Sequence, residues 1–231
     1  MISDIKMALQ LTIGGDDKTS QIEAGSLKIA NILTKKRDTA SFNILNHTGD
    51  TYKPSLGREV VIYDGATKIF GGVITEIESK AQAYAVVRHE VHCQDYTRLL
   101  DKKLVPDTYS NMTVDAIIAD LKTNYFPTGF TTTNVNAPVV IDYTAFQYKP
   151  LAKCLEELAE MINYDWYVDY NKDVHFFAKE SSAAPFNLLD SDGSYRYDSL
   201  VIRRDNSQIR NSIVVRGGEY LGSNYTAEIQ C

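Results

Sequence analysis

The segment GREVVIYDGATKIFGGVITEIE, residues 57–78, sets the structural class of this chain. Apolar residues occupy alternate positions on both sides of a central YDGAT, as shown by Val60 and Ile62 and then by Ile69, Gly71, Val73 and Ile77. Such alternation is typical of β-strands with one buried face, and an Asp-Gly pair between two such runs is typical of a tight turn. The segment therefore predicts two strands joined by a turn at residues 63–67.

Gly71 and Gly72 lie in the middle of the second of these strands. Glycine weakens the interior of a strand unless a bulge, a sharp bend or a close backbone approach requires it. We interpret this glycine pair as a corner of a β-barrel.

The same alternation extends over residues 27–93, with Ala40, Phe42 and Ile44 as a second clear example. Segments of turn-forming composition interrupt it at NHTGD (Asn46–Asp50) and at ESKAQA (Glu78–Ala83). Short strands separated by such breaks are typical of an antiparallel barrel or sandwich. We therefore expect residues 1–95 to form the first part of a β-barrel domain.

After Asp95 the apolar residues follow a helical period. Thr113 is a candidate N-cap, and the apolar residues after it recur at helical spacing: Val114, Ile117, Ile118, Leu121 and Tyr125. Pro150 stands at the start of a second amphipathic helix, whose apolar face carries Leu151, Leu155, Leu158 and Ile162. We expect Asn163 to end this second helix.

Strand-like segments return near the C-terminal end, at Ser199–Asp205, at Asn211–Gly217 and at YTAEIQC, residues 225–231. The order β, then α/β, then β predicts an α+β protein that is mostly β, with an antiparallel β-barrel domain interrupted by an α/β insertion. We expect the barrel in residues 1–95, the insertion in residues 96–190 and the returning strands in residues 191–231. These returning strands either complete the barrel or also start a second one.

The composition excludes several classes of protein. The 231 residues are 44% apolar and 23% charged, which is typical of a globular chain and not of a disordered one. A net charge of -6 without a long basic run argues against a surface that binds nucleic acid. Three distant cysteines, Cys93, Cys154 and Cys231, fit reduced thiols better than a disulfide framework. The sequence shows neither a signal peptide nor a membrane span.

The segment NYDWYVDYNKDVHFF, Asn163–Phe177, is the strongest candidate for an active site, because it holds three aspartates and a histidine. Asp165 and Asp169 would share a face of one strand about 13 Å apart. Paired glycosidase carboxylates need roughly 5–9.5 Å. Any other pairing depends on the register of a hairpin formed by this segment.

Two registers are open. If Asn171 and Lys172 form the loop, Val168 lies opposite His175 and Asp169 points to the other side. If Asn171–Asp173 forms the loop, Asp169 faces His175, and one apolar face packs against the helices, made of Trp166, Val168, Tyr170, Val174 and Phe176. We prefer the second register, in which the Asp169–His175 pair still lacks a nucleophile, a metal set or a second carboxylate within reach.

Three other motifs carry weaker signals. In HEVH, His89 and His92 would point to opposite faces of a strand, so they cannot share a metal ion and are expected at the surface. Cys154 lies beside the apolar stripe of its helix and is expected to be a buried, inert thiol and not a nucleophile paired with His175. The segment GGDDKT, Gly14–Thr19, lacks the spacing of a phosphate-binding loop and is expected to form a turn.

Four segments in order resemble the tail-hub proteins of tailed bacteriophages: residues 39–78, which contain TASFNIL and the opening segment; CQDYTRLLDKKLVPDTYSNMTVDAIIADL; PLAKCLEELAEMINYDWYVDYNKDVHFF; and NSIVVRGG. The resemblance covers roughly residues 26–218. It implies a structural virion protein of the tail tip or baseplate hub, which joins the tail tube to the tip complex and leaves a channel for DNA.

The resemblance also implies partners and a location. Expected partners are further copies of the chain in a homotrimer, together with distal tail, tube, tip or fibre proteins, while DNA passes without specific binding. The expected location is the virion, assembled in the host cytoplasm. Hubs usually continue through a second barrel, whereas this chain ends at Cys231 within a strand-like run, so either the chain is a fragment or the second barrel is missing.

No catalytic, cofactor-binding or metal-ligating residue and no cofactor is expected, and the chain is not expected to be an enzyme. Two alternatives stay open. One is a cell-wall hydrolase that uses Asp165, Asp169 or Asp173 near His175. The other is a carbohydrate-binding module that acts through exposed tyrosines and Trp166.

Overall fold

A computed structural model describes residues 9–32, 37–47, 49–50, 52–84, 86–179, 181, 212–220 and 223–230. The chain divides into two compact units, residues 1–182 and residues 183–231. The described secondary structure is mostly β, as the sequence predicts.

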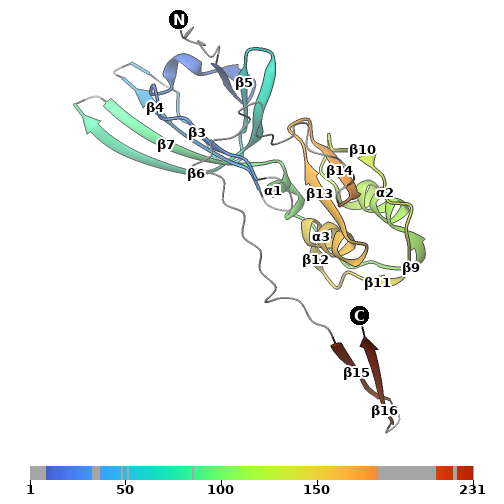
Figure 1. Ribbon diagram of the computed structural model, residues 1–231. Helices are drawn as coiled ribbons and strands as arrows, with labels where there is room; N and C mark the ends of the chain where they lie inside the picture. The colour runs from blue at the N-terminus through green and yellow to red at the C-terminus, as the bar shows by residue number, and fades with distance from the viewer. Residues whose placement is uncertain are drawn as a thin grey trace, which may run out of the picture. The chain divides into compact units, whose positions relative to one another are not determined.

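The N-terminal part of the first unit is one antiparallel sheet of seven strands (Figure 1). These strands are β1 (Leu9–Ile13), β2 (Asp16–Asp17), β3 (Lys28–Ala30), β4 (Thr39–Asn46), β5 (Glu59–Asp64), β6 (Thr67–Ala83) and β7 (Val86–Asp95). A short 3₁₀ helix, η1 (Thr19–Gln21), follows β2. The order across the sheet is β2-β1-β5-β6-β7-β4-β3. In the part of the chain that the structure describes, β2 and β3 do not pair with each other, so closure of a barrel stays a prediction.

The buried face of this sheet follows the predicted alternation. Ala40, Phe42 and Ile44 of β4 and Val60 and Ile62 of β5 are each at most 2% exposed. They share one core with residues of the other strands: Leu11, Ile13, Phe70, Ile74, Val91 and Cys93. Each large apolar side chain that is fully buried here contributes about 1.5–3 kcal/mol relative to exposure.

Gly71 and Gly72 are required by close approaches. A Cβ on Gly72 would lie 2.1 Å from the carbonyl oxygen of Gln94 and 2.8 Å from its carbonyl carbon, both in the backbone of β7. A Cβ on Gly71 would lie 2.8 Å from the ring of Tyr96 and 3.2 Å from Cβ of Tyr170. These contacts account for the two glycines without the barrel corner that the sequence suggested.

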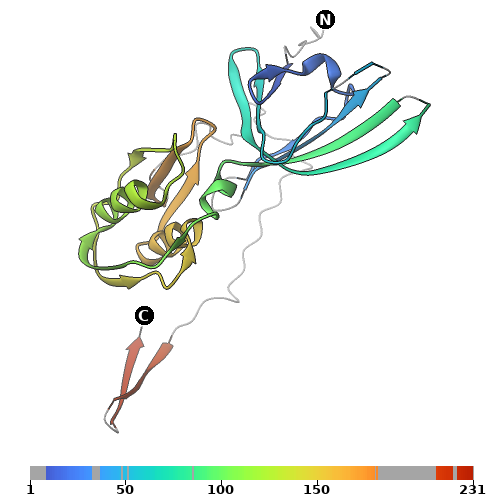
Figure 2. The same cartoon turned by 180° about the vertical axis from the view of Figure 1, so that it is seen from behind.

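Strand β6 continues through Glu78–Ala83, so the turn expected there is wrong. That segment contains neither glycine nor proline, and it pairs with β7 as far as Ala83 opposite Val86, so the chain turns at Tyr84 instead. Beyond Ile74, the opposite edge of β6 pairs with no strand in the described residues. Figures 1 and 2 show the β6–β7 hairpin projecting past the other strands.

The rest of the first unit folds around a core of its own, formed by residues between Tyr96 and Phe176. Its elements are α1 (Thr97–Leu100), β8 (Leu104–Val105), β9 (Thr108–Thr113), α2 (Val114–Tyr125), β10 (Thr131–Val135), β11 (Val140–Ala145), β12 (Lys149–Pro150), α3 (Leu151–Met161), β13 (Tyr164–Val168) and β14 (Asp173–Ala178). Strand β14 lies between β10, which is parallel to it, and β13, which is antiparallel. Strands β9 and β11 form a separate ribbon, and so do β8 and β12.

Both predicted amphipathic helices are confirmed as α2 and α3, and the four-residue α1 was not predicted. Helix α2 follows Thr113 and buries four of the five predicted apolar residues completely: Val114, Ile117, Ile118 and Leu121. The first two N–H groups of α2 donate to the carbonyls of Val139 and Ala137, at 2.9 and 3.1 Å. Thr113 stands at the N-cap position but makes no side-chain cap bond.

Helix α3 ends where the sequence predicts. Its last residue is Met161, and Asn163 has a φ of 57°, the left-handed conformation that asparagine tolerates after a helix. Pro150 stands one residue earlier than predicted, as the N-cap, because Leu151 is the first helical residue. Leu155 and Leu158 are fully buried against the core.

The β13–β14 hairpin has neither of the two registers considered from the sequence. Val168 lies opposite Val174, and the N–H of Asp169 donates to the carbonyl of Asp173 at 2.9 Å. The loop is therefore Tyr170–Lys172, with the last residue at a φ of 66°. This is the three-residue hairpin loop in which a turn is followed by one residue in the left-handed conformation. The loop could not be predicted from the sequence because that residue is a lysine and not a glycine.

The buried face of this hairpin is confirmed in four of its five predicted members. Trp166, Val168, Val174 and Phe176 are each at most 5% exposed. Tyr170 was wrongly placed with them, since in the observed register it lies in the loop and packs on the core of the seven-stranded sheet.

The second unit contains one antiparallel ribbon, β15 (Ser212–Tyr220) and β16 (Ser223–Gln230). Two of the three returning strands, those predicted at Asn211–Gly217 and residues 225–231, are thereby confirmed. The third, predicted at Ser199–Asp205, lies outside the described residues.

Candidate functional site

The β13–β14 hairpin brings Asp169, Asp173 and His175 together. Nε2 of His175 lies 3.6 Å from Oδ2 of Asp169 and 3.8 Å from Oδ2 of Asp173. Tyr167, opposite His175 in the register, stacks on the imidazole with ring centroids 4.5 Å apart. The second carboxylate near His175 was not expected, and it follows from the observed loop. Asp165 lies opposite Phe177, outside this cluster.

The acceptor sites of Asp173 are used within the sheet. Oδ1 accepts hydrogen bonds from the hydroxyl of Thr131 and from the N–H of Thr133 (2.8 Å), and Oδ2 accepts from the N–H (3.2 Å) and side-chain amide (2.8 Å) of Asn134. Burial by itself raises the pKa of Asp173, but these hydrogen bonds outweigh it and hold the pKa below its usual value. The carboxylate thus fastens β10 to β14 where their register shifts.

The Asp169 carboxylate also accepts hydrogen bonds from the backbone. Its Oδ1 accepts the N–H groups of Asn171 and Asp173, both at 2.8 Å, which closes the loop between the two strands. Nε2 of His175 is buried and has no hydrogen-bond partner. Among the described residues His175 makes no hydrogen bond to a serine, threonine or cysteine, and no group of His, Cys, Asp and Glu side chains is placed to hold a metal ion. The two carboxylates of the cluster therefore bind groups of the hairpin and of β10.

The HEVH residues lie on β7, and His89 and His92 point to opposite faces as predicted. The expectation that both are surface residues is wrong for His89, which is 7% exposed. Its Nδ1 lies 2.7 Å from the hydroxyl of Ser79. His92 lies beside Glu90, with Nε2 3.7 Å from its carboxylate.

Cys154 is fully buried on α3, as predicted, and burial raises its pKa to about 12. Cys93 is equally buried, and the pKa of its thiol is also raised to about 12 by burial. Neither thiol ionises near neutral pH, so neither is an activated nucleophile. Gly14 and Gly15 of GGDDKT connect β1 to β2 in the expected turn.

The hairpin loop Tyr170–Lys172 meets the seven-stranded sheet at a polar contact, here called the junction. The hydroxyl of Tyr170 donates to Oδ2 of Asp38 at 2.6 Å, and its ring lies 5.8 Å from that of Phe70. Nζ of Lys68 donates to the carbonyl of Tyr170 and to Oδ1 of Asn171, both at 2.9 Å. The loop is therefore bound to the sheet by both polar and aromatic contacts.

A second set of contacts at the junction converges on Glu59. Its Oε1 lies 2.9 Å from Nζ of Lys172 and accepts the hydroxyl of Tyr96 at 2.7 Å. Lys172 also lies over the Tyr96 ring, 4.7 Å from its centroid. The hydrogen bonds from Tyr96 and Lys172 lower the pKa of Glu59.

The junction was not predicted from the sequence, although Gly71, a glycine inside a strand, was an indication of it. The bare backbone at Gly71 leaves room for Tyr96 and Tyr170 to reach the sheet. A pocket of about 290 Å³ is lined by Tyr170 together with Asp38, Asp95 and Asp169.

We expect Tyr170→Phe to lower the free energy of unfolding by about 1–2 kcal/mol, because it removes a hydrogen bond to a carboxylate and keeps the ring. Urea unfolding at constant pH measures the loss. Tyr143→Phe is the matched control, since that ring is 65% exposed. Equal stability of the two variants would contradict a stabilising role for the Tyr170 hydroxyl.

Asp95 makes the stability of the junction depend on pH. It is 4% exposed and accepts the N–H groups of Asp38 (2.8 Å) and Thr97 (2.9 Å). Burial raises its pKa to about 6 from an ordinary 3.8, and the nearby Asp38 charge adds to the rise. The folded state therefore holds this proton more tightly than the unfolded state. Its stabilising contribution is present below about pH 4 and is lost as the pH rises through 6.

For this group alone, we expect the free energy of unfolding to fall by about 2–3 kcal/mol between pH 4 and pH 7. Asp95→Asn removes the titration, so its stability should change less over this range than that of the unmodified chain. Parallel urea titrations of both proteins test the difference in slope. Identical pH profiles would contradict the assignment.

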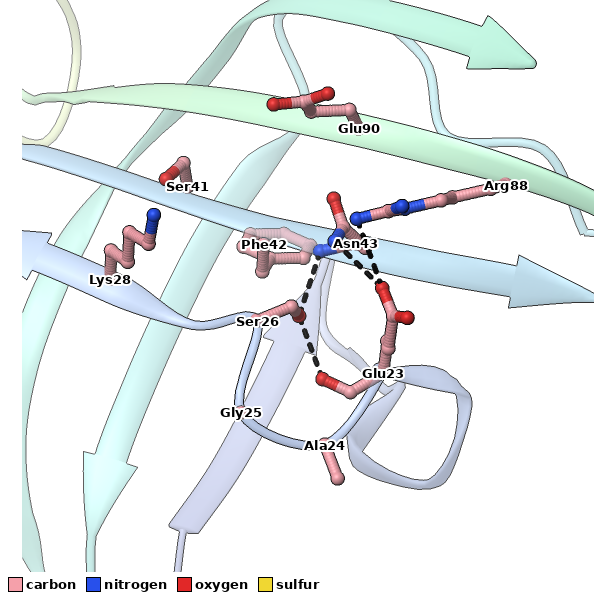
Figure 3. A pocket seen from close by; sticks show the side chains of 10 residues that line it. All are labelled: Glu23, Ala24, Gly25, Ser26, Lys28, Ser41, Phe42, Asn43, Arg88 and Glu90. Atoms are coloured by element: carbon pink, nitrogen blue, oxygen red, sulfur yellow. Dashed lines mark hydrogen bonds and ion pairs between the residues drawn. The ribbon is translucent and has the colours of Figure 1, made fainter. Parts of the chain in front are cut away.

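A shallow polar pocket of about 340 Å³ lies between the loop of residues 23–26 and strands β4 and β7 (Figure 3). Ser26 Oγ donates to the carbonyl of Glu23 at 2.7 Å and accepts the N–H of Asn43 at 3.0 Å. The Glu23 carboxylate accepts the Asn43 side-chain amide at 2.7 Å and pairs with Arg88 at 3.3 Å. Because these groups bind one another, they hold the loop of residues 23–26 against the sheet.

No family model and no curated protein sequence matches this chain. Solved structures do match its fold. The 43 kDa tail protein of prophage MuSo2 from Shewanella oneidensis has a TM-score of 0.66 and 13% identity, covering 96% of this chain and 68% of that one. The prophage tail protein gp18 from Listeria monocytogenes gives 0.62 and 13%, covering 96% and 67%. This chain has the fold of phage tail proteins.

Two further structures extend this likeness. The tail protein from Neisseria meningitidis has a TM-score of 0.61 at 13% identity, covering 96% of this chain and 66% of that one. A type VI secretion component from E. coli, described as similar to the T4 tail proteins gp27 and gp5, gives 0.51 at 16%, covering 74% and 49%. The chain thus spans about two thirds of the length of the tail proteins that it matches.

None of the helices in the described residues is long and apolar enough to cross a membrane.

Proposed function

We propose that this chain is a structural subunit of the tail-tip or baseplate hub of a phage tail. In this role it joins the tail tube to the tip complex and surrounds a channel for DNA. The observation that carries the proposal is the fold shared with three tail proteins over 96% of the chain. The type VI secretion component, itself described as similar to the T4 tail proteins gp27 and gp5, supports a structural role in a tail.

The sheet offers a physical reason to assemble. An unpaired strand edge exposes N–H and C=O groups that favour pairing with another chain. Within the described part of the chain, the edge of β6 beyond Ile74 is of this kind. We propose that copies of the chain assemble through such edges into a homotrimeric ring, which other tail proteins contact above and below.

We propose three parts for the chain: a β-barrel domain in residues 1–95, an α/β insertion in 96–190 and returning strands in 191–231. The two cores support the first boundary, since one uses residues up to Cys93 and the other begins at Tyr96. A lone two-stranded ribbon such as β15–β16 is marginally stable in water. Strands of this C-terminal part are therefore proposed to complete the barrel.

The charge of the chain suits a passage for DNA. At a net charge of -6, the protein has little attraction for the phosphate backbone, so DNA is proposed to pass without specific binding. We propose the virion tail as its location, with assembly in the host cytoplasm.

Mass measurement in solution over a range of concentrations, followed by electron-microscope imaging, tests the hub. We expect a trimer that appears as a ring with a central opening. A chain that stays monomeric and forms no ring, alone or with tail partners, would refute the proposal.

A structural role is favoured over the two alternatives. The Asp169 carboxylate accepts backbone N–H groups of the hairpin, and the Asp173 carboxylate accepts donors of β10. Trp166 is 2% exposed, so its ring offers no platform for sugars. We expect no cell-wall hydrolysis by the unmodified chain. Activity that disappears in both Asp169→Asn and His175→Ala, while both variants stay folded, would instead establish a hydrolase.

A further inference from the structure

Another free strand edge of the first unit lies on β11. This strand pairs with β9 along one side and with no described strand along the other. Around it, large apolar side chains are exposed: Val139 (37%), Val140 (54%), Tyr143 (65%) and Tyr148 (72%). An apolar edge without lysine, proline or a bulge is not protected against pairing, so it is expected to be covered when the protein is assembled.

The free edges of β6 and β11 differ in chemistry. The β6 edge, residues 75–83, carries Glu76, Glu78 and Lys80 and ends in the uncharged residues 81–83. The β11 edge is apolar and carries one exposed acid, Asp142, which has no ion-pair or hydrogen-bond partner among the described residues. Lys80 pairs with Glu78 at 3.1 Å, but both side chains are more than half exposed, so this bond contributes little. Lys80 on the β6 edge is therefore available to pair with the unpartnered Asp142 on the β11 edge.

The two edges also lie at opposite ends of the unit formed by residues 1–182. Figures 1 and 2 show the β6–β7 hairpin at one end and the insertion that contains β11 at the other. They are too far apart to pair within one molecule. A cyclic ring requires two different surfaces on each subunit, because each copy contacts the next one head to tail.

We propose that the β6 edge of one copy pairs antiparallel with the β11 edge of the next copy. This inference rests on the proposed ring, and it names the contact that builds it. Placing Lys80 opposite Asp142 sets the register, which then pairs Ser79 with Tyr143 and Ala81 with Ile141. Each of these two pairs matches a small side chain with a large one, and no like charges lie directly opposite.

Disulfide trapping tests the contact. The full chain with Cys231→Ser is the background, because Cys93 and Cys154 are buried. Lys80→Cys and Asp142→Cys are made separately, mixed in equal amounts and oxidised mildly. Residues opposite each other in an antiparallel pair have Cα atoms about 4.5–5.5 Å apart, within the range that a disulfide spans. We expect a linked dimer in the mixture, at least about tenfold above either variant alone.

The matched control replaces Lys80→Cys by Lys153→Cys. Lys153 lies on α3, and its side chain is 65% exposed, against 63% for Lys80. Mixed with Asp142→Cys, it should give no more linked dimer than a single variant. Strong linkage by Asp142→Cys alone would indicate a symmetric β11–β11 contact and would overturn the proposal.

Charge reversal gives an independent test. Lys80→Glu or Asp142→Lys alone should raise the concentration for half-assembly about fivefold to thirtyfold, and the double variant should restore it to within about threefold. Rings that form normally in all variants, without the linked dimer, would reject this contact and leave the hub intact. A chain that is monomeric at every concentration would reject the hub itself.

Discussion

Gly72→Ala is expected to destabilise the protein by about 3 kcal/mol or more, the upper end of overpacking effects. The new Cβ would lie 2.1 Å from the carbonyl oxygen of Gln94. That atom belongs to the backbone of β7, so no side-chain rotation relieves the clash and the strands must separate. Because β6 and β7 form the centre of the sheet, we expect the loss across the whole first unit. Thermal and urea unfolding of the full chain measure it.

Two other glycines serve as controls. Gly65 has a φ of 58° and open space around its Cβ position, so Gly65→Asn should cost less than about 1 kcal/mol. Gly71→Ala should fall between the two, since its nearest obstacle is the ring of Tyr96, which can shift. If Gly72→Ala were as stable as Gly65→Asn, the close approach of β6 and β7 would be refuted.

Asp173→Ala is expected to cost about 3–5 kcal/mol. The substitution leaves four donors of Thr131, Thr133 and Asn134 without their acceptor, in a site where Asp173 itself is 7% exposed. Asp173→Asn retains one oxygen and should cost less. Asp16→Ala, at an exposed aspartate of β2, should stay within about 0.5 kcal/mol. Urea unfolding of the three variants ranks them.

The lowered pKa of Asp173 also predicts how the free energy of unfolding changes in acid. Because its folded pKa lies below the ordinary 3.8, its stabilisation is present above about pH 4 and is lost as the pH falls through the folded value. Unfolding measured between pH 5 and pH 2.5 should show a steeper loss for the unmodified chain than for Asp173→Ala. Parallel curves would mean that Asp173 is not held as the ionised form by β10.

The sequence predicts those features that depend on neighbours in the chain. Alternation of Phe42 and Ile44 locates a strand, and the spacing of Ile117 and Leu121 locates a helix, because each pattern follows from the geometry of one element. The position of Asn163 after α3 follows from its tolerance of left-handed backbone.

The sequence fails where distant segments decide the outcome. Residues 78–83 resemble a turn by composition, yet pairing with β7 keeps them extended. The hairpin loop could be read in two ways, and the structure contains a third, because Lys172 takes a conformation that its type rarely adopts. The partners of Asp173 on β10 lie about forty residues away, and no local pattern reveals them.

Lys172 illustrates a compromise between two levels of structure. A glycine at this position would make the easier turn, since a left-handed lysine costs about 1–2 kcal/mol. Glycine, however, has no amine to reach Glu59. Lysine at this position makes the turn less favourable, but its side-chain amine fixes the angle between two separately packed cores. Among relatives, a glycine here should accompany an insertion that tilts more freely, whereas a long basic residue should accompany a fixed one.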